Sequence, residues 1–293
     1  MIHKVSLKPH DLCGGGLDIG GTLCKVVVVR PGEELSSVVL HECSCEDILD
    51  YVMKAGVQFC GATGSRAVEF RHCAQCRRDS GVPNVPQVLC VNEFVAWGNG
   101  AAKLLPSSCG VEFPYLLGSI GTGTSILLVN GFTITRVGGS ALGGGTILGL
   151  GRVAIPGISF GDLCRLASLG NRCEVDLLLK DIYAPGQIGI ADNITASNFG
   201  KLAGDKLIPR PSDADIAAGI ISMVGENIAL VVSEMMNIYH THTIVYGGST
   251  LCHNTVLRSV LMRAGELLHH RAVILDRGEF TGAVGAYELA LAY

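Results

Sequence analysis

The sequence contains few charged residues, 16% of its 293 positions, and 48% hydrophobic residues. At this length we expect roughly two domains, each with its own buried core. Lysine and arginine (22 residues) are fewer than aspartate and glutamate (26 residues), which gives a net charge of -4. The chain therefore has no broad positive field, and we do not expect it to bind nucleic acid by neutralising phosphates.

No segment offers the ~20 uninterrupted apolar residues that a membrane-spanning helix needs. The most apolar stretch, Ile216 to Val232, is interrupted by Glu226 and Asn227, and residues 141–160 include six glycines. The first residues also lack the apolar core and cleavage site of a secretory signal. We therefore expect a cytoplasmic protein that does not bind membranes and whose twelve cysteines are reduced thiols.

Two glycine-rich turns lie between apolar segments of β type. The first is Asp18-Ile19-Gly20-Gly21-Thr22, with Lys25 following, and the second is Gly121-Thr122-Gly123-Thr124-Ser125. Turns of this kind can direct backbone N–H groups toward a phosphate. Neither has the spacing of a P-loop or of a dinucleotide-binding turn, which join a strand to a helix. One such turn alone is equally consistent with a hairpin that binds nothing, but two favour paired halves that close on one nucleotide.

Hydrophobic periodicity predicts alternating strands and helices. In the first half we predict strands at 5–9, 16–20, 25–30, 36–41, 57–64 and 88–91 and helices at 47–56, 65–78 and 92–101. In the second half we predict strands at 115–119, 125–129, 133–137, 243–249 and 273–275 and helices at 159–169, 215–240, 253–268 and 281–292. The expected caps are Ser65 and either Asp213 or Asp215. This order predicts an α/β protein with a weak internal repeat, divided into domains 1–105 and 106–293.

The two turns resemble the phosphate motifs of the actin-like ATPase superfamily, which includes sugar kinases, Hsp70-type chaperones and actin. Tyr246-Gly247-Gly248-Ser249 resembles the adenosine motif of the same superfamily. The resemblance implies two ribonuclease-H-like domains with a nucleotide cleft between them.

Longer strings narrow the resemblance to type II pantothenate kinases, over about residues 14–292. These strings are Asn92-Glu93-Phe94, 121–128, 136–146, Lys180-Asp181-Ile182-Tyr183 and 279–286, of which 136–146 is the most specific. The resemblance implies ATP-dependent phosphorylation of pantothenate to 4′-phosphopantothenate with Mg²⁺, the first step of coenzyme A synthesis. It also implies a homodimer, for which the long apolar helix 215–240 is a candidate contact.

Phosphoryl transfer to an alcohol requires alignment, charge neutralisation and a base for the hydroxyl proton. Glu93, at the start of a helix that follows a strand, is the candidate base, and the resemblance gives it the same role. The resemblance also implies that Arg136 holds the pantothenate carboxylate, with Thr122 and Ser125 nearby. An arginine can make two parallel hydrogen bonds to a carboxylate. The alternatives are a Glu93 that only interacts with the helix dipole and an Arg136 in a surface ion pair.

The other expected site residues bind the nucleotide. By resemblance, Asp18 orients Mg²⁺ through water and Lys25 offsets phosphate charge. The glycines and hydroxyl residues that would line the nucleotide are Gly20, Gly21, Thr22, Gly121, Gly123, Gly144, Gly145, Gly247, Gly248 and Ser249. A purely structural Asp18, and a turn at 143–146 that only packs against a helix, stay as alternatives.

Two other functions stay open. One is a kinase of the same superfamily that acts on a sugar or an amino sugar. The other is an ATPase that activates a partner protein and bridges an iron–sulfur cluster with cysteines, for which Cys73 and Cys76 are candidates. A zinc site formed by these two with Cys43, Cys45 and Cys60 is disfavoured by their irregular spacing.

The sequence departs from the family pattern at two places. Ser65-Arg66 stands where the family usually has a run of glycines, and Asn92 stands where many relatives have an acidic residue. Asp181 and Tyr183 match the family, but the residues themselves suggest no role for them.

Overall fold

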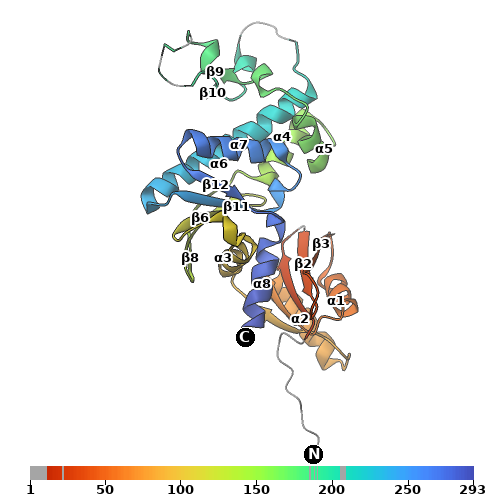
Figure 1. Ribbon diagram of the computed structural model, residues 1–293. Coiled ribbons are helices and arrows are strands. Elements are labelled where there is room, and N and C mark those ends of the chain that lie inside the picture. Colours follow the sequence, from red (N-terminus) through yellow and green to blue (C-terminus); the bar gives the residue numbers. More distant parts are fainter. Residues whose placement is uncertain (1–11, 22, 185, 188, 190, 205–208) are drawn as a thin grey trace, which may run out of the picture.

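The computed structural model describes residues 12–293 except 22, 185, 188, 190 and 205–208, so the strand predicted at 5–9 lies outside the described residues. The chain forms two α/β lobes, each built on a five-stranded mixed sheet (Figure 1). The first sheet contains β1 (Gly14–Ile19), β2 (Leu23–Val29), β3 (Ser36–His41), β4 (Phe59–Thr63) and β5 (Gln87–Cys90). The second contains β6 (Tyr115–Ile120), β7 (Thr124–Asn130), β8 (Thr133–Ser140), β11 (Thr243–Gly247) and β12 (Arg271–Ile274).

The two sheets have the same topology. Their strand orders are β3-β2-β1-β4-β5 and β8-β7-β6-β11-β12. In each sheet the first three strands in sequence pair antiparallel, and the last two are parallel to the first. The predicted α/β fold of two ribonuclease-H-like domains is therefore confirmed, and so is the internal repeat.

Helices cover the outer face of each sheet. α1 (Cys45–Lys54) and α2 (Ala67–Asp79) cover the first sheet, and α4 (Gly144–Ala154), α5 (Phe160–Ala167), α6 (Asp213–Tyr239) and α7 (Thr255–Leu267) cover the second. α6 could cross a membrane by length and composition, with a mean hydropathy of 1.8, but 72% of that apolar window is buried inside the protein. Its apolar character is explained by its place in the core of the second lobe.

Three local expectations were wrong. The N-cap of α2 is Arg66, without a side-chain hydrogen bond, and not Ser65. The N-cap of α6 is Ser212, whose hydroxyl accepts a hydrogen bond from the Asp215 N–H group, so neither aspartate is the cap. α4 was not predicted, because consecutive glycines disfavour a helix.

Two helices lie between the sheets (Figure 1). α3 (Glu93–Leu104), from the first half of the chain, packs against the second sheet through Trp97 and Ala101. α8 (Thr281–Leu291), from the second half, packs against β1 and β4 of the first sheet. Each half of the sequence thus supplies a helix to the sheet of the other. A division of the chain at 105/106 stays a prediction.

Glycines allow α3 and α8 to approach closely. A Cβ atom at Gly285 would lie 1.7 Å from the Ala96 carbonyl oxygen, and one at Gly100 would lie 1.8 Å from the Thr281 oxygen. α8 lies equally close to β1, where a Cβ at Gly16 would be 2.0 Å from the Ala283 oxygen. No side chain larger than hydrogen fits these positions without moving a backbone.

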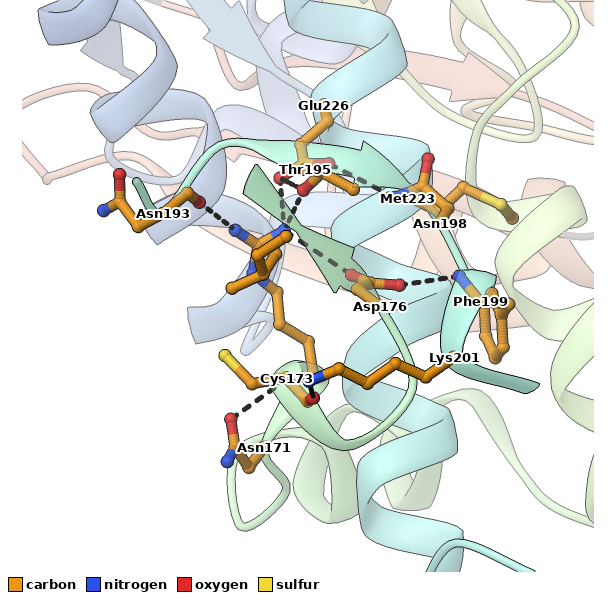
Figure 2. A network of polar contacts seen from close by, with 12 residues as sticks. Asn171, Cys173, Asp176, Asn193, Thr195, Asn198, Phe199, Lys201, Met223 and Glu226 are labelled. Atoms are coloured by element: carbon orange, nitrogen blue, oxygen red, sulfur yellow. Dashed lines mark hydrogen bonds and ion pairs between the residues drawn. The ribbon is translucent and has the colours of Figure 1, made fainter. Parts of the chain in front are cut away.

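The chain between α5 and α6 forms a small subdomain. It contains the strands β9 (Leu177–Leu178) and β10 (Thr195–Ser197) and the 3-10 helices η3 (Arg172–Glu174), η4 (Leu179–Asp181) and η5 (Gly200–Ala203). Three further 3-10 helices lie outside it: η2 (Ser107–Cys109), η6 (Ser249–Leu251) and η7 (Gly278–Phe280). Figure 2 shows the polar network that fastens it to α6. The Arg172 guanidinium binds Glu226 of α6 and the Thr195 hydroxyl, and Asp176 accepts a hydrogen bond from the Phe199 N–H group at 2.9 Å.

We predict that Gly285→Ala destabilises the protein by about 3 kcal/mol, because the added methyl group collides with the α3 backbone. Gly149→Ala is the matched control, since a Cβ at this exposed position of α4 has no atom within 4 Å. The control should be about 0.5–1 kcal/mol more stable than the parent chain. Urea unfolding measures both, and equal stabilities of the two variants would contradict the close packing of α3 and α8.

Candidate active site

The first phosphate turn places a buried carboxylate beside a lysine. Asp18 on β1 is paired in register with Lys25 on β2, and the Lys25 Nζ atom lies 3.7 Å from Asp18 Oδ2. Gly20 closes the turn by donating its N–H to the Leu23 oxygen at 3.0 Å, and Gly21 faces open space. Thr22 lies outside the described residues.

Asp18 lies in a narrow cradle formed by two glycines. The residue is only 5% exposed, and burial raises the pKa of its carboxyl group, an effect that Lys25 opposes. A Cβ at Gly64 would lie 2.9 Å from Oδ1, and a Cβ at Gly282 of α8 would lie 2.9 Å from Oδ2. A side chain at either position would collide with the carboxylate, so both glycines let the backbone lie directly against Asp18. A carboxylate oxygen is a ligand of the kind that Mg²⁺ and its water molecules bind.

Glu93 belongs to the same electrostatic cluster. It is the first residue of α3, and partial burial followed by the negative charge of Asp18 raises its pKa, whereas Lys25 lowers it. Asn92 caps the helix, since its Oδ1 atom accepts hydrogen bonds from the N–H groups of Phe94 and Val95. The departure from the family pattern at Asn92 thus supplies an effective cap that fixes the position of Glu93.

The second phosphate turn is joined to α4 and to the adenosine turn. The Gly121 oxygen accepts hydrogen bonds from the Gly144 N–H group and from the Thr250 hydroxyl, both at 2.8 Å. The Thr122 oxygen accepts from Gly145 at 3.0 Å. The N–H groups of Gly144 and Gly145 are therefore engaged within the protein, and these residues begin α4 instead of forming a turn that packs against a helix. That they also line the nucleotide stays a prediction.

The turn Tyr246 to Ser249, which resembles the adenosine motif, packs against the end of β6, η7 and α3. Gly248 has a φ of +119°, donates its N–H to the Gly278 oxygen at 3.0 Å and leaves no room for a Cβ, which would lie 2.2 Å from the Ile120 oxygen. A Cβ at Gly247 would lie 3.3 Å from the Trp97 ring. Ser249 follows as the first residue of η6.

A β-bulge determines where Arg136 points. Leu127 pairs with Arg136, but its neighbour Ile126 pairs with Gly138, so β8 contains one extra residue. Because side chains alternate along a strand, the bulge puts Arg136 on the same face as Gly139 and its partner Ser125. The Arg136 Nη2 atom indeed lies 2.7 Å from the place of a Cβ on Gly139. Leu127 on this face packs with Trp97, so Arg136 and Ser125 lie on the side that α3 covers.

The expected surface ion pair of Arg136 is not found in the part of the chain that the structure describes. Thr122 is an exposed residue of the second phosphate turn. Its carbonyl oxygen accepts a hydrogen bond from the Gly145 N–H group.

Other residues singled out from the sequence lie elsewhere. The Arg66 guanidinium binds the Cys43 oxygen at 3.0 Å and Glu69, so its charge is engaged within the protein. Asp181 accepts a hydrogen bond from the Leu178 N–H group at 2.9 Å and pairs with Lys201 at 3.1 Å, which gives it a structural role.

The cysteines form no obvious metal centre. All twelve are free thiols, and the described residues contain no group of three or more His, Cys, Asp or Glu side chains that could hold a metal ion. Cys73 and Cys76 lie on α2, which covers the outer face of the first sheet.

Sequence reasoning missed Trp97, Gly64 and Gly282. A Cβ at Gly282 would lie 3.0 Å from the Trp97 Nε1 atom, so the indole lies beside the cradle of Asp18 as well as beside Gly247. One signal was available, because Trp97 is the single tryptophan of the sequence and follows Glu93 by four residues. The two glycines lie in segments that the family resemblance already marked, the turn before Ser65-Arg66 and the string 279–286, but their distance from Asp18 in the chain hid their contact with it.

Comparison with known proteins agrees with this geometry. The Fumble family model matches residues 90–288. A type II pantothenate kinase of Bacillus cereus (strain G9842) is 31% identical over 275 residues, covering 92% of this chain and 96% of that protein. A type II pantothenate kinase of Oceanobacillus iheyensis is 31% identical over 274 residues, covering 92% and 97%.

Solved structures support the fold. The activator of 2-hydroxyisocaproyl-CoA dehydratase from Clostridium difficile, with bound ADPNP, has a TM-score of 0.62 at 16% identity and covers 96% of this chain and 95% of that one. A glucokinase of the ROK family from Streptomyces griseus, with glucose and AMPPNP, has a TM-score of 0.60 at 14% identity and covers 96% and 100%. At such identities these structures establish only the shared architecture. By the family model and by its full-length sequence relatives, the chain belongs to the Fumble family of type II pantothenate kinases.

Proposed function

We propose that the chain catalyses ATP-dependent phosphorylation of pantothenate to 4′-phosphopantothenate, the first step of coenzyme A synthesis, in the cytoplasm. The observation that carries this proposal is the cluster of Asp18, Lys25 and Glu93 beside a glycine turn, in a chain whose full-length relatives are named type II pantothenate kinases. The two alternatives are less well supported, because sugar kinases and dehydratase activators resemble this chain at only 14–16% identity.

ATP would bind across the two glycine turns. Gly21 and Gly121 face open space where phosphate oxygens could approach the backbone, and Lys25 would offset their charge. Gly20, Gly123 and Thr22 complete these turns. The adenosine would lie along Gly247–Ser249. Mg²⁺ bound to ATP would neutralise charge on the phosphates, and Asp18 would hold it through water.

Glu93 would act as the base. Its carboxylate would accept the proton of the pantothenate hydroxyl as that oxygen bonds to the γ-phosphorus of ATP and the bond to the ADP oxygen breaks. A raised pKa makes the carboxylate a stronger base, and the Asn92 cap holds it at a fixed helix start. Arg136 would hold the pantothenate carboxylate in two hydrogen bonds, with the hydroxyls of Thr122 and Ser125 nearby.

The enzyme would act as a homodimer. α6 carries two large exposed apolar side chains, Leu230 (54% exposed) and Ile238 (59% exposed). Residues four and eight positions apart lie on one side of a helix, so the two share a face of α6 with exposed Glu234 between them, and a second copy of the chain could cover this face.

If pantothenate is the substrate, the release of ADP from ATP should require pantothenate. Glucose and N-acetylglucosamine should not replace it. Arg136→Ala should raise the KM for pantothenate about tenfold or more, because a charge-assisted hydrogen-bond pair is lost. Panthenol, which lacks the carboxylate, should be used equally by both forms.

Arg165→Ala, which removes an exposed arginine of α5, is the control and should leave the KM unchanged. An absence of ADP release with both pantothenate and N-substituted pantothenamides would refute the function. An unchanged KM in Arg136→Ala would instead show that the carboxylate is held elsewhere.

Glu93→Gln should lower kcat by ~100-fold or more while ATP still binds, because the amide cannot accept the hydroxyl proton. Binding can be followed by the fluorescence of Trp97, which lies beside the adenosine turn. In the parent enzyme kcat should fall as the pH is lowered through the raised pKa of Glu93, since protonation removes the base. The variant should lack this decline. Glu112→Gln, at an exposed position, is the control, and near-normal kcat in Glu93→Gln would exclude Glu93 as the base.

For the dimer, sedimentation velocity should give a mass twice the 30.7 kDa of one chain. Leu230→Glu combined with Ile238→Glu should produce monomers, because charges would be buried in the contact. Val68→Glu, at a 62% exposed position of α2, should remain dimeric. A parent protein that sediments as a monomer at micromolar concentration would rule the dimer out.

A further inference from the structure

A second cavity lies in the second lobe, apart from the glycine turns. It has a volume of about 500 Å³ and lies between the end of α5, η3, α6 and α7. This volume is in the range of sites that bind small molecules. Its lining residues are Ala167, Ser168, Gly170, Asn171, Arg172, Cys173, Ala218, Ser222, Thr255, Val256, Ser259, Val260 and Arg263. None of these belongs to the proposed catalytic or nucleotide-binding residues.

The charge of this cavity is positive. Two arginines line it, and the lining includes no aspartate or glutamate. Arg172 is already compensated, because its guanidinium pairs with Glu226 and with Asp176 in the network of Figure 2. Arg263, in contrast, makes no ion pair with any residue of the described ranges. A negatively charged ligand would supply the missing partner.

The N-terminus of α7 opens onto the same cavity. Asn254 caps this 13-residue helix by accepting a hydrogen bond from the Leu257 N–H group. Thr255 and Val256, which precede Leu257, both line the cavity, and their N–H groups have no partner within the helix. The positive end of the helix dipole therefore adds to the charge of Arg263.

Ser222 provides an independent indication of a ligand. It lies on α6, lines the cavity and is only 2% exposed. In the described part of the chain no residue forms a hydrogen bond with its hydroxyl, and the oxygen is not one of the fully enclosed polar atoms, so it reaches the surface of the cavity. Buried hydroxyl groups in proteins nearly always have a partner. A group that fills the cavity would satisfy this one.

We propose that this cavity binds a small organic anion bearing a phosphate or carboxylate group. Arg263, the Ser222 hydroxyl and the first N–H groups of α7 would hold the anionic group. Ala167, Ala218 and Val260 form an apolar wall against which a carbon skeleton would pack. The site is separate from the proposed kinase centre, and either could exist without the other.

Cys173 allows a test at the site itself, because it lines the cavity and is partly exposed. The full chain, with its nucleotide turns saturated by a non-hydrolysable ATP analogue, is alkylated with iodoacetamide at increasing inorganic phosphate or acetate. Peptide mass spectrometry gives the rate at Cys173. When the anion concentration is ten times its dissociation constant, the alkylation rate of Cys173 should fall about tenfold, since roughly one cavity in eleven is then empty.

Arg263→Gln should abolish this protection, and Ser222→Ala should shift it to higher anion concentrations. Arg258→Gln, a change of the same charge on the same helix but outside the cavity, should keep it. Exposed Cys76 is the internal reference for reagent effects, and Cys60, which is fully buried, must stay unmodified in every folded variant.

Protection by phosphate alone would identify a phosphate-bearing ligand, and protection by acetate alone a carboxylate-bearing one. Three results would overturn the proposal: no saturable protection of Cys173 by either anion, equal protection in Arg263→Gln while Cys60 stays unmodified, or an equal decrease at Cys76.

Discussion

The close contact of α3 with α8 is the constraint on which the rest of the structure depends. Each helix comes from one half of the chain and covers the sheet of the other half, and Gly100 and Gly285 let their backbones meet without intervening side chains. The candidate base Glu93 begins α3, and Gly282 of α8 forms one wall of the Asp18 cradle. The relative position of the two acidic groups is therefore set by helix packing and not by the loops around them.

This packing also brings the charged groups of the site close together. Two carboxylates, Asp18 and Glu93, share the field of a single lysine, Lys25, and both have raised pKa values. Burial is the largest cause in each case, so the ionised carboxylates are disfavoured mainly because water is removed from them, and less because they repel each other. A cation bound near these two groups would stabilise the ionised forms of both carboxylates at once.

The sequence predicted what depends on local pattern. The strands around Asp18 and around Gly121 alternate or are continuously apolar, and hairpin turns mark their ends, so both sheets and the repeat could be foreseen. α4 could not be, because its first glycines form a helix only through hydrogen bonds to Gly121 and Thr122. The cradle of Asp18 was equally hidden, since Gly64 and Gly282 meet it only in the folded chain. The exchange of α3 and α8 between lobes is a third feature that no local pattern specifies.

The lobes alone do not determine the substrate. Proteins with this architecture include a dehydratase activator and a glucokinase at 16% and 14% identity, so the acceptor must be selected by features added to the common sheets. The bulge in β8 determines the position of Arg136, which we propose to be one such feature. Without the extra residue, regular alternation would put Arg136 and Gly139 on opposite faces, and the guanidinium would lie on the outer side with α6. With it, Arg136 shares a face with Ser125 and with the helix that begins at Glu93. One inserted residue thus brings Arg136, the proposed carboxylate-binding group, to the side of the sheet where Glu93, the proposed base, begins α3.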